Sequence, residues 1–85
     1  MLRLVGEIDM SSAETLEGIL REEREKDSEL RLDLSEVTFM DSTGLRVLLS
    51  LAASHGVVIV RPSAAVRRLF EVAIPHGVPG MEIRG

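Results

Sequence analysis

The run Phe39-Met40-Asp41-Ser42-Thr43-Gly44-Leu45-Arg46-Val47-Leu48-Leu49 decides how this chain is organised. It passes from the apolar end of a strand, through a short polar corner, into a largely apolar helix. Ser42 stands at the corner, where the first backbone N–H groups of a helix lack intrahelical partners and the helix dipole is positive. Because serine is a preferred N-cap residue, the simplest interpretation of Ser42 is a helix cap.

Strands and helices alternate on both sides of this corner. Alternating apolar residues predict strands at 2–8 and 30–40, a β-branched run predicts a buried strand at 57–60, and residues 81–84 can form a last strand. Apolar residues three and four apart predict helices after a capping box at 11–14, after Ser42 and after Ser63. We therefore expect one α/β domain, residues 1–85, with an about four-stranded, mainly parallel sheet and three helices.

The composition excludes several classes of function. The chain has 85 residues, a formal charge of -4, and two Phe but no Tyr or Trp, which argues against nucleic acid as a partner. There is no cysteine and no apolar run near the roughly 20 residues of a membrane span. We expect a cytoplasmic protein without disulfides or a membrane-spanning helix.

Catalytic chemistry has little support in the sequence. Asp9, Asp33 and Asp41 could bring carboxylates to one sheet edge and hold Mg²⁺ or accept a phosphate, but Asp33 is flanked by strand leucines and should point to a sheet face. His55 and His76 adjoin glycines at predicted loops and lack partners at metal-ligand spacing. No Gly-x-Ser-x-Gly elbow is present. We expect neither an enzyme nor a cofactor.

A phosphate on Ser42 is the second hypothesis for the corner. It would place about -1.5 to -2 charges at the positive end of a helix, where the fold should tolerate them. The helix periodicity puts Thr43 and Arg46 on the face away from the core, with Val47 on its shoulder. This mixed apolar and polar patch would suit a protein partner, which the phosphate would repel.

Three blocks of the chain resemble the STAS family, and within it the bacterial anti-sigma factor antagonists. They are Gly6-Glu7-Ile8-Asp9, the run from Leu32 through the Asp41-Ser42-Thr43-Gly44 corner to Leu45, and Arg61 to Phe70. The blocks occur in the family's order and span nearly the whole chain. The resemblance implies a non-enzymatic αβ domain that binds an anti-sigma factor of the serine kinase type when unphosphorylated, and so frees a sigma factor.

The resemblance also assigns roles to the corner residues. It implies that the kinase phosphorylates Ser42, that the complex then dissociates, and that a serine phosphatase resets the switch. Asp41 would orient the acceptor, and the contacted residues would include Thr43, Gly44, Arg46 and Val47. The alternative is a STAS accessory subunit of a lipid-transport or stressosome-like complex, which docks a partner without phosphotransfer. Members usually have another strand before the first block. Without that strand an edge of the sheet would be uncovered, so we also consider a homodimer.

Overall fold

Strands and helices alternate along the whole chain, as the sequence predicts. The computed structural model describes all 85 residues. The elements are β1 (Leu2–Ile8), α1 (Ala13–Lys26), β2 (Arg31–Met40), α2 (Ser42–Ser54), β3 (Val57–Val60), α3 (Ala64–Ala73) and β4 (Met81–Arg84).

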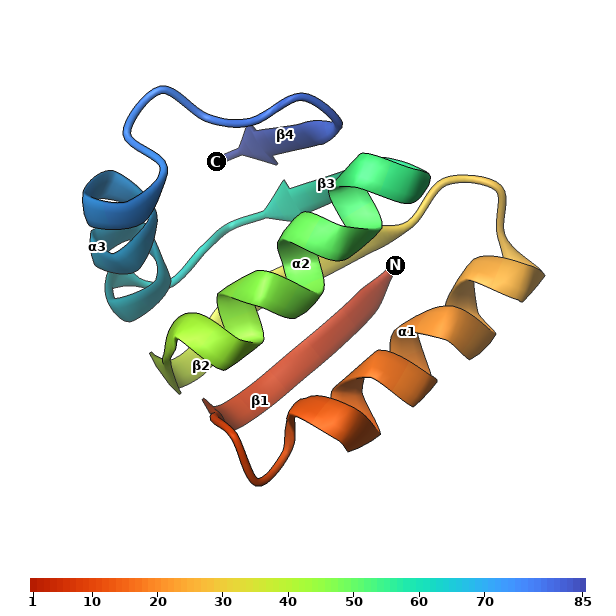
Figure 1. Ribbon diagram of the computed structural model, residues 1–85, viewed down its shortest axis with the longest axis horizontal. Coiled ribbons are helices and arrows are strands. Elements are labelled where there is room, and N and C mark those ends of the chain that lie inside the picture. The colour runs from red at the N-terminus through yellow and green to blue at the C-terminus, as the bar shows by residue number, and fades with distance from the viewer.

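The four strands form one sheet in the order β1-β2-β3-β4, and every neighbouring pair is parallel (Figure 1). The α/β prediction is confirmed, and the sheet is wholly parallel rather than mainly so. Each connection runs through a helix to the next strand, so right-handed crossovers stack the helices against one face. β1 and β4 are the edges of the sheet, and self-association through an edge stays a prediction.

One face of the sheet carries the hydrophobic core. The core cluster joins residues of all three helices to those strand residues that face them, and it is almost entirely aliphatic. Leu20 of α1, Leu48 of α2 and Val66 of α3 are completely buried over Leu32 and Ile59 of the sheet. This packing fixes the position of each helix on the sheet.

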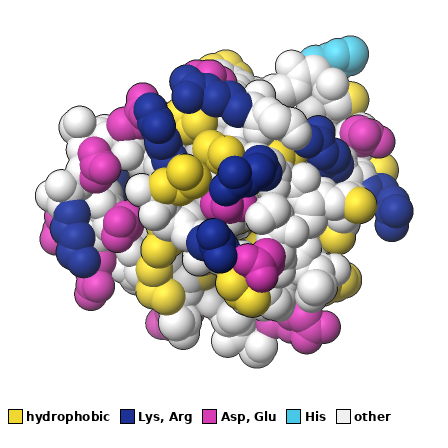
Figure 2. Space-filling view, turned by 180° about the vertical axis from the view of Figure 1, so that it is seen from behind, with side chains coloured by type: hydrophobic (Ala, Val, Ile, Leu, Met, Phe, Trp, Pro, Cys, Tyr) yellow, Lys and Arg dark blue, Asp and Glu magenta, His cyan; other side chains and the backbone are white.

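Arginines and carboxylates cover the other face in place of helices. Seen from behind, Lys and Arg side chains gather there around acidic groups (Figure 2). Asp33 lies between Leu32 and Leu34 in β2, so its side chain points to this face. There it lies beneath the basic side chains, with only 2% of its surface exposed. Arg61 donates a hydrogen bond to its carboxylate, and Arg3 Nε lies 3.8 Å from Asp33 Oδ2. The carboxylate is thus paired, which a buried charge requires.

The predicted capping box before α1 is wrong. The N–H and Oγ of Ser11 donate to Asp9 Oδ1, at 3.0 and 2.6 Å, and the Ser12 hydroxyl accepts from the Asp9 N–H at 3.0 Å. α1 therefore has no side-chain cap, because both hydroxyls are engaged by the turn that follows β1. α3 begins after Ser63 as predicted, and Ser63 Oγ caps it by accepting from the Val66 N–H at 3.2 Å.

Candidate functional site

The polar corner lies where β1 and β2 end side by side. Ile8 and Met40 are register partners, and the Asp41 N–H donates to the Ile8 carbonyl at 3.2 Å. Parallel strands end at the same sheet edge, so the turn after β1 comes to lie beside the start of α2. Sheet topology thus brings residues about 30 positions apart to one corner.

Asp41, and not Ser42, caps α2. Asp41 Oδ1 accepts from the N–H of Thr43 at 2.9 Å, from the Thr43 hydroxyl at 2.5 Å and from the N–H of Gly44 at 3.2 Å. The predicted cap at Ser42 is wrong, because Asp41 is the extended residue before the helix and Ser42 is the first helical residue.

The same contacts hold the Asp41 carboxylate in its charged form. The Thr43 hydroxyl is the main cause of a pKa below the usual range, and the backbone N–H groups of Gly44, Thr43 and Met10 add to it. Met10 follows β1, so the end of the first strand also contributes to the charge state of this carboxylate. Asp41 is therefore a structural anion that fixes the corner.

Ser42 is left exposed and takes no part in the cap. α1 and α2 begin at the same end of the sheet and run side by side (Figure 1). Ala13, in the first turn of α1, lines the same hollow as Thr43 and Arg46. The positive ends of two helix dipoles therefore meet close to the free hydroxyl.

Arg46 lies one helical turn after Ser42 and is exposed. Residues four apart on a helix are surface neighbours, so its guanidinium can reach a group carried by Ser42. None of the ion pairs of the protein involves Arg46. The corner thus joins a free hydroxyl to a cation without a carboxylate partner.

The predicted exposure of Val47 is wrong. Its residue surface is only 8% exposed, and it belongs to the hydrophobic core cluster. α1 packs alongside α2 and covers the shoulder of the helix that periodicity alone leaves open. Val47 remains at the bottom of a hollow between the two helices, in which Ala13 and Ser50 take part.

Gly44 is buried, and it contributes to the site by allowing close packing. A Cβ added at this position would lie 2.7 Å from Ile8 Cγ2 and 2.9 Å from Met40 Cγ. The start of α2 therefore sits directly on the ends of β1 and β2, which is possible only without a side chain. This close approach sets the position of Ser42.

Met10 and Phe39 supply the exposed apolar surface near the corner. Met10 is 77% exposed and Phe39 is 48% exposed. Phe39 pairs with Glu7 in the sheet, one residue before the corner-facing pair of Ile8 and Met40. Alternation along β2 was the available signal for Phe39, because Met40 faces the core and its neighbour must face outward.

The three carboxylates considered for a metal site do not gather. Asp33 lies under arginines on the open face, and Asp9 is held by Ser11, which lowers the pKa of Asp9. No three His, Asp or Glu side chains of the chain are grouped to hold a metal ion, and His55 and His76 join no such group.

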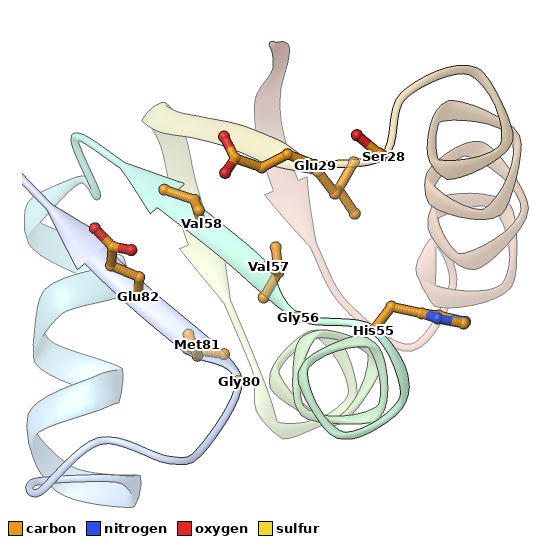
Figure 3. A pocket seen from close by; sticks show the side chains of 10 residues that line it. Ser28, Glu29, His55, Gly56, Val57, Val58, Gly80, Met81 and Glu82 are labelled. Atoms are coloured by element: carbon orange, nitrogen blue, oxygen red, sulfur yellow. The ribbon is translucent and has the colours of Figure 1, made fainter.

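The largest cavity, of about 570 Å³, lies at the opposite end of the sheet, at the start of β3 and β4. Its polar side chains do not converge (Figure 3). Glu29 and Glu82 lie toward the open face, where Arg31 and Arg84 pair with them, while His55 extends toward α1. We therefore place the candidate site at the Ser42 corner.

Comparison with known proteins agrees with this fold. The family model described as "Mlab, STAS domain" matches residues 1–77. A solved structure of the anti-sigma factor antagonist SpoIIAA in its unphosphorylated form is similar with a TM-score of 0.62 and 22% identity, over 94% of this chain and 76% of that chain. None of the three helices has the length and apolar character to cross a membrane. The chain belongs to the STAS domain family.

Proposed function

We propose that this protein is an anti-sigma factor antagonist whose binding is switched by phosphorylation of Ser42. The unphosphorylated corner binds an anti-sigma factor of the serine kinase type. Phosphotransfer to Ser42 releases that partner, and a serine phosphatase restores the binding form. The observation that carries the proposal is the free Ser42 hydroxyl, exposed on the first turn of α2 because Asp41 performs the capping.

The local charges suit a phosphate at this hydroxyl. Two helix N-termini lie near it, and Arg46 stands one turn away. A phosphate would gain from the helix dipole and from an (i, i+4) pairing with Arg46. The fold should therefore persist while the charge of the surface changes by about two units.

The contact surface in this proposal consists of Ser42, Thr43 and Arg46 with the exposed apolar residues Met10 and Phe39. Asp41 and Gly44 belong to it as the groups that position the helix start. Val47 reaches a partner only through the hollow between α1 and α2.

The test compares Ser42→Ala with Ser42→Glu in binding to the cognate anti-sigma kinase, measured by calorimetry. We expect Ser42→Ala to bind constitutively and Ser42→Glu to bind at least about tenfold more weakly, a difference of about 1.4 kcal/mol. Like charges about 4 Å apart at an effective dielectric near 20 supply enough energy for this. Equal affinities for the two variants would refute the switch.

A second candidate is an accessory subunit of a lipid-transport or stressosome-like complex, with the same corner docking a partner without phosphotransfer. This candidate is supported by the matching family model, whose description, "Mlab, STAS domain", does not name an anti-sigma factor antagonist. Incubation with the kinase and ATP, followed by mass spectrometry, separates the two. Phosphate on Ser42 supports the antagonist. If no kinase encoded near this gene transfers phosphate to the protein, the accessory subunit is supported.

A further inference from the structure

A groove runs between α1 and α2 from the Ser42 corner to the far ends of both helices. Its upper hollow, of about 330 Å³, is lined by Thr43 and Arg46. A second hollow shares Val47 and Ser50 with the first. A third hollow, toward the ends of both helices, shares Arg24 and His55 with the second. The three hollows thus adjoin one another and form a groove that starts beside the proposed phosphorylation site.

The groove is locally basic on a chain that is acidic overall. Its charged lining consists of Arg21, Arg24 and Arg46 against Glu17 and Glu25, on a protein of net charge -4. Only Arg21 has a carboxylate partner, Glu17 at 3.5 Å. Three arginines against two glutamates leave the lining with one excess positive charge. Arg24 and Arg46, at its two ends, take part in none of the ion pairs of the protein.

Arg24 is the strongest sign that the groove is incomplete. Its Nε is buried and has no hydrogen-bond partner. The Nε itself is closed off from outside, but Arg24 is partly exposed and takes part in none of the ion pairs of the protein. An external carboxylate would pair with the exposed part of this guanidinium. His55, at the end of α2, extends toward α1 beside it (Figure 3).

We propose that the α1–α2 groove binds an extended acidic segment of the partner, with carboxylates on Arg46 at one end and Arg24 at the other. The partner's identity rests on the proposed function above. From Thr43 to His55, α2 rises about 18 Å at 1.5 Å per residue. An extended segment covers that length with about six residues at roughly 3.3 Å each.

This groove explains how a phosphate on Ser42 would release the partner. The phosphate would pair with Arg46 and so remove one of the cations that the acidic segment uses. It would also add about -1.5 to -2 charges at the mouth of the groove. Release then needs no change of fold, because attraction is replaced by repulsion at one end of the groove.

The experiment titrates the ¹⁵N-labelled protein with an acetylated, amidated hexapeptide Glu-Thr-Glu-Thr-Glu-Thr and follows amide shifts by NMR. The control peptide carries Gln in place of each Glu. We expect shifts along α2 from Val47 to Ser54 with the acidic peptide only. Arg24→Ala should weaken the affinity about fivefold. Arg68→Ala, which removes an exposed arginine of α3 outside the groove, should leave the affinity unchanged.

The proposal fails if the shifts gather on the open sheet face around Arg31 and Arg84, if the Gln peptide binds equally well, or if Arg24→Ala and Arg68→Ala behave alike. Ser42→Glu, but not Ser42→Gln, should also weaken peptide binding. If phosphorylation of Ser42 releases the kinase but the acidic peptide causes no amide shifts, the groove proposal alone is wrong. Groove binding of the peptide with no phosphotransfer to Ser42 overturns the switch alone.

Discussion

At the scale of single residues, a few charged and small side chains decide the geometry of the site. Asp41 caps α2 and so frees the hydroxyl of Ser42. Gly44 lets the helix start rest on Ile8 and Met40. The sequence points to the corner correctly but exchanges the roles of its two polar residues, because aspartate and serine are about equally good caps and only the backbone shows which one precedes the helix.

Asp33 makes the stability of the protein depend on pH in the acid range. The Arg61 hydrogen bond is the main cause of a strongly lowered pKa of Asp33, supported by the N–H of Ser35. A depressed folded-state pKa contributes stability that is fully present above the unfolded value near 4 and is lost as the pH falls below it. We expect the free energy of unfolding, measured with urea, to fall between about pH 4 and pH 2.

Asp33→Asn is the matched variant for this measurement. It should be less stable than the natural protein at pH 7, and the gap between the two should narrow steadily as the pH falls from about 4 to 2. A constant gap over this range would show that the charge of Asp33 is not the source of the stability.

At the scale of elements, the contact between α1 and α2 decides which side chains of α2 are available. Periodicity identifies the inner stripe of α2 correctly, with Leu45, Leu48 and Ala52 buried. It cannot show how far a neighbouring helix overlaps the shoulder of that stripe. Val47 is therefore core, while Met10 and Phe39 become the exposed apolar groups near the site.

Val47→Asp should destabilise the fold, because it places a charge in a nearly closed contact between helices. We expect a loss of about 2–4 kcal/mol by urea denaturation, within the range known for unpaired buried polar groups. Val72→Asp is the control, since Val72 of α3 is 79% exposed and should tolerate the charge. Equal stabilities for the two variants would place Val47 on the surface after all.

At the scale of the whole molecule, the segment that leads into β4 makes one tight contact with the end of α2. Gly80 has a φ of +86°, its carbonyl accepts from the Val57 N–H at 2.8 Å, and an added Cβ would lie 2.1 Å from the Ala52 carbonyl oxygen. A side chain at residue 80 would therefore force β4 and the end of α2 apart.

Gly80→Ala should lower the free energy of unfolding by at least about 1–3 kcal/mol, from overpacking combined with backbone strain. Gly77→Ala is the matched control, because Gly77 also has a positive φ of 72° but open space at the Cβ position. Hydrogen exchange should show faster opening at Val57 and Met81 in Gly80→Ala alone. If Gly77→Ala were equally destabilised, strain rather than the close approach to Ala52 would be the cause.

The sequence by itself determined the order of elements, the parallel α/β sheet, the inner faces of the helices and the corner at Ser42, because period and turn chemistry are local properties of the chain. Tertiary structure alone decided that Asp41 is the cap, that α1 buries Val47, and that Asp33 lies among arginines from β1 and from the segment after β3. These facts depend on which distant segments meet, and so does the basic groove between α1 and α2. A residue's exposure and partners are set by its neighbours in space, which local pattern does not record.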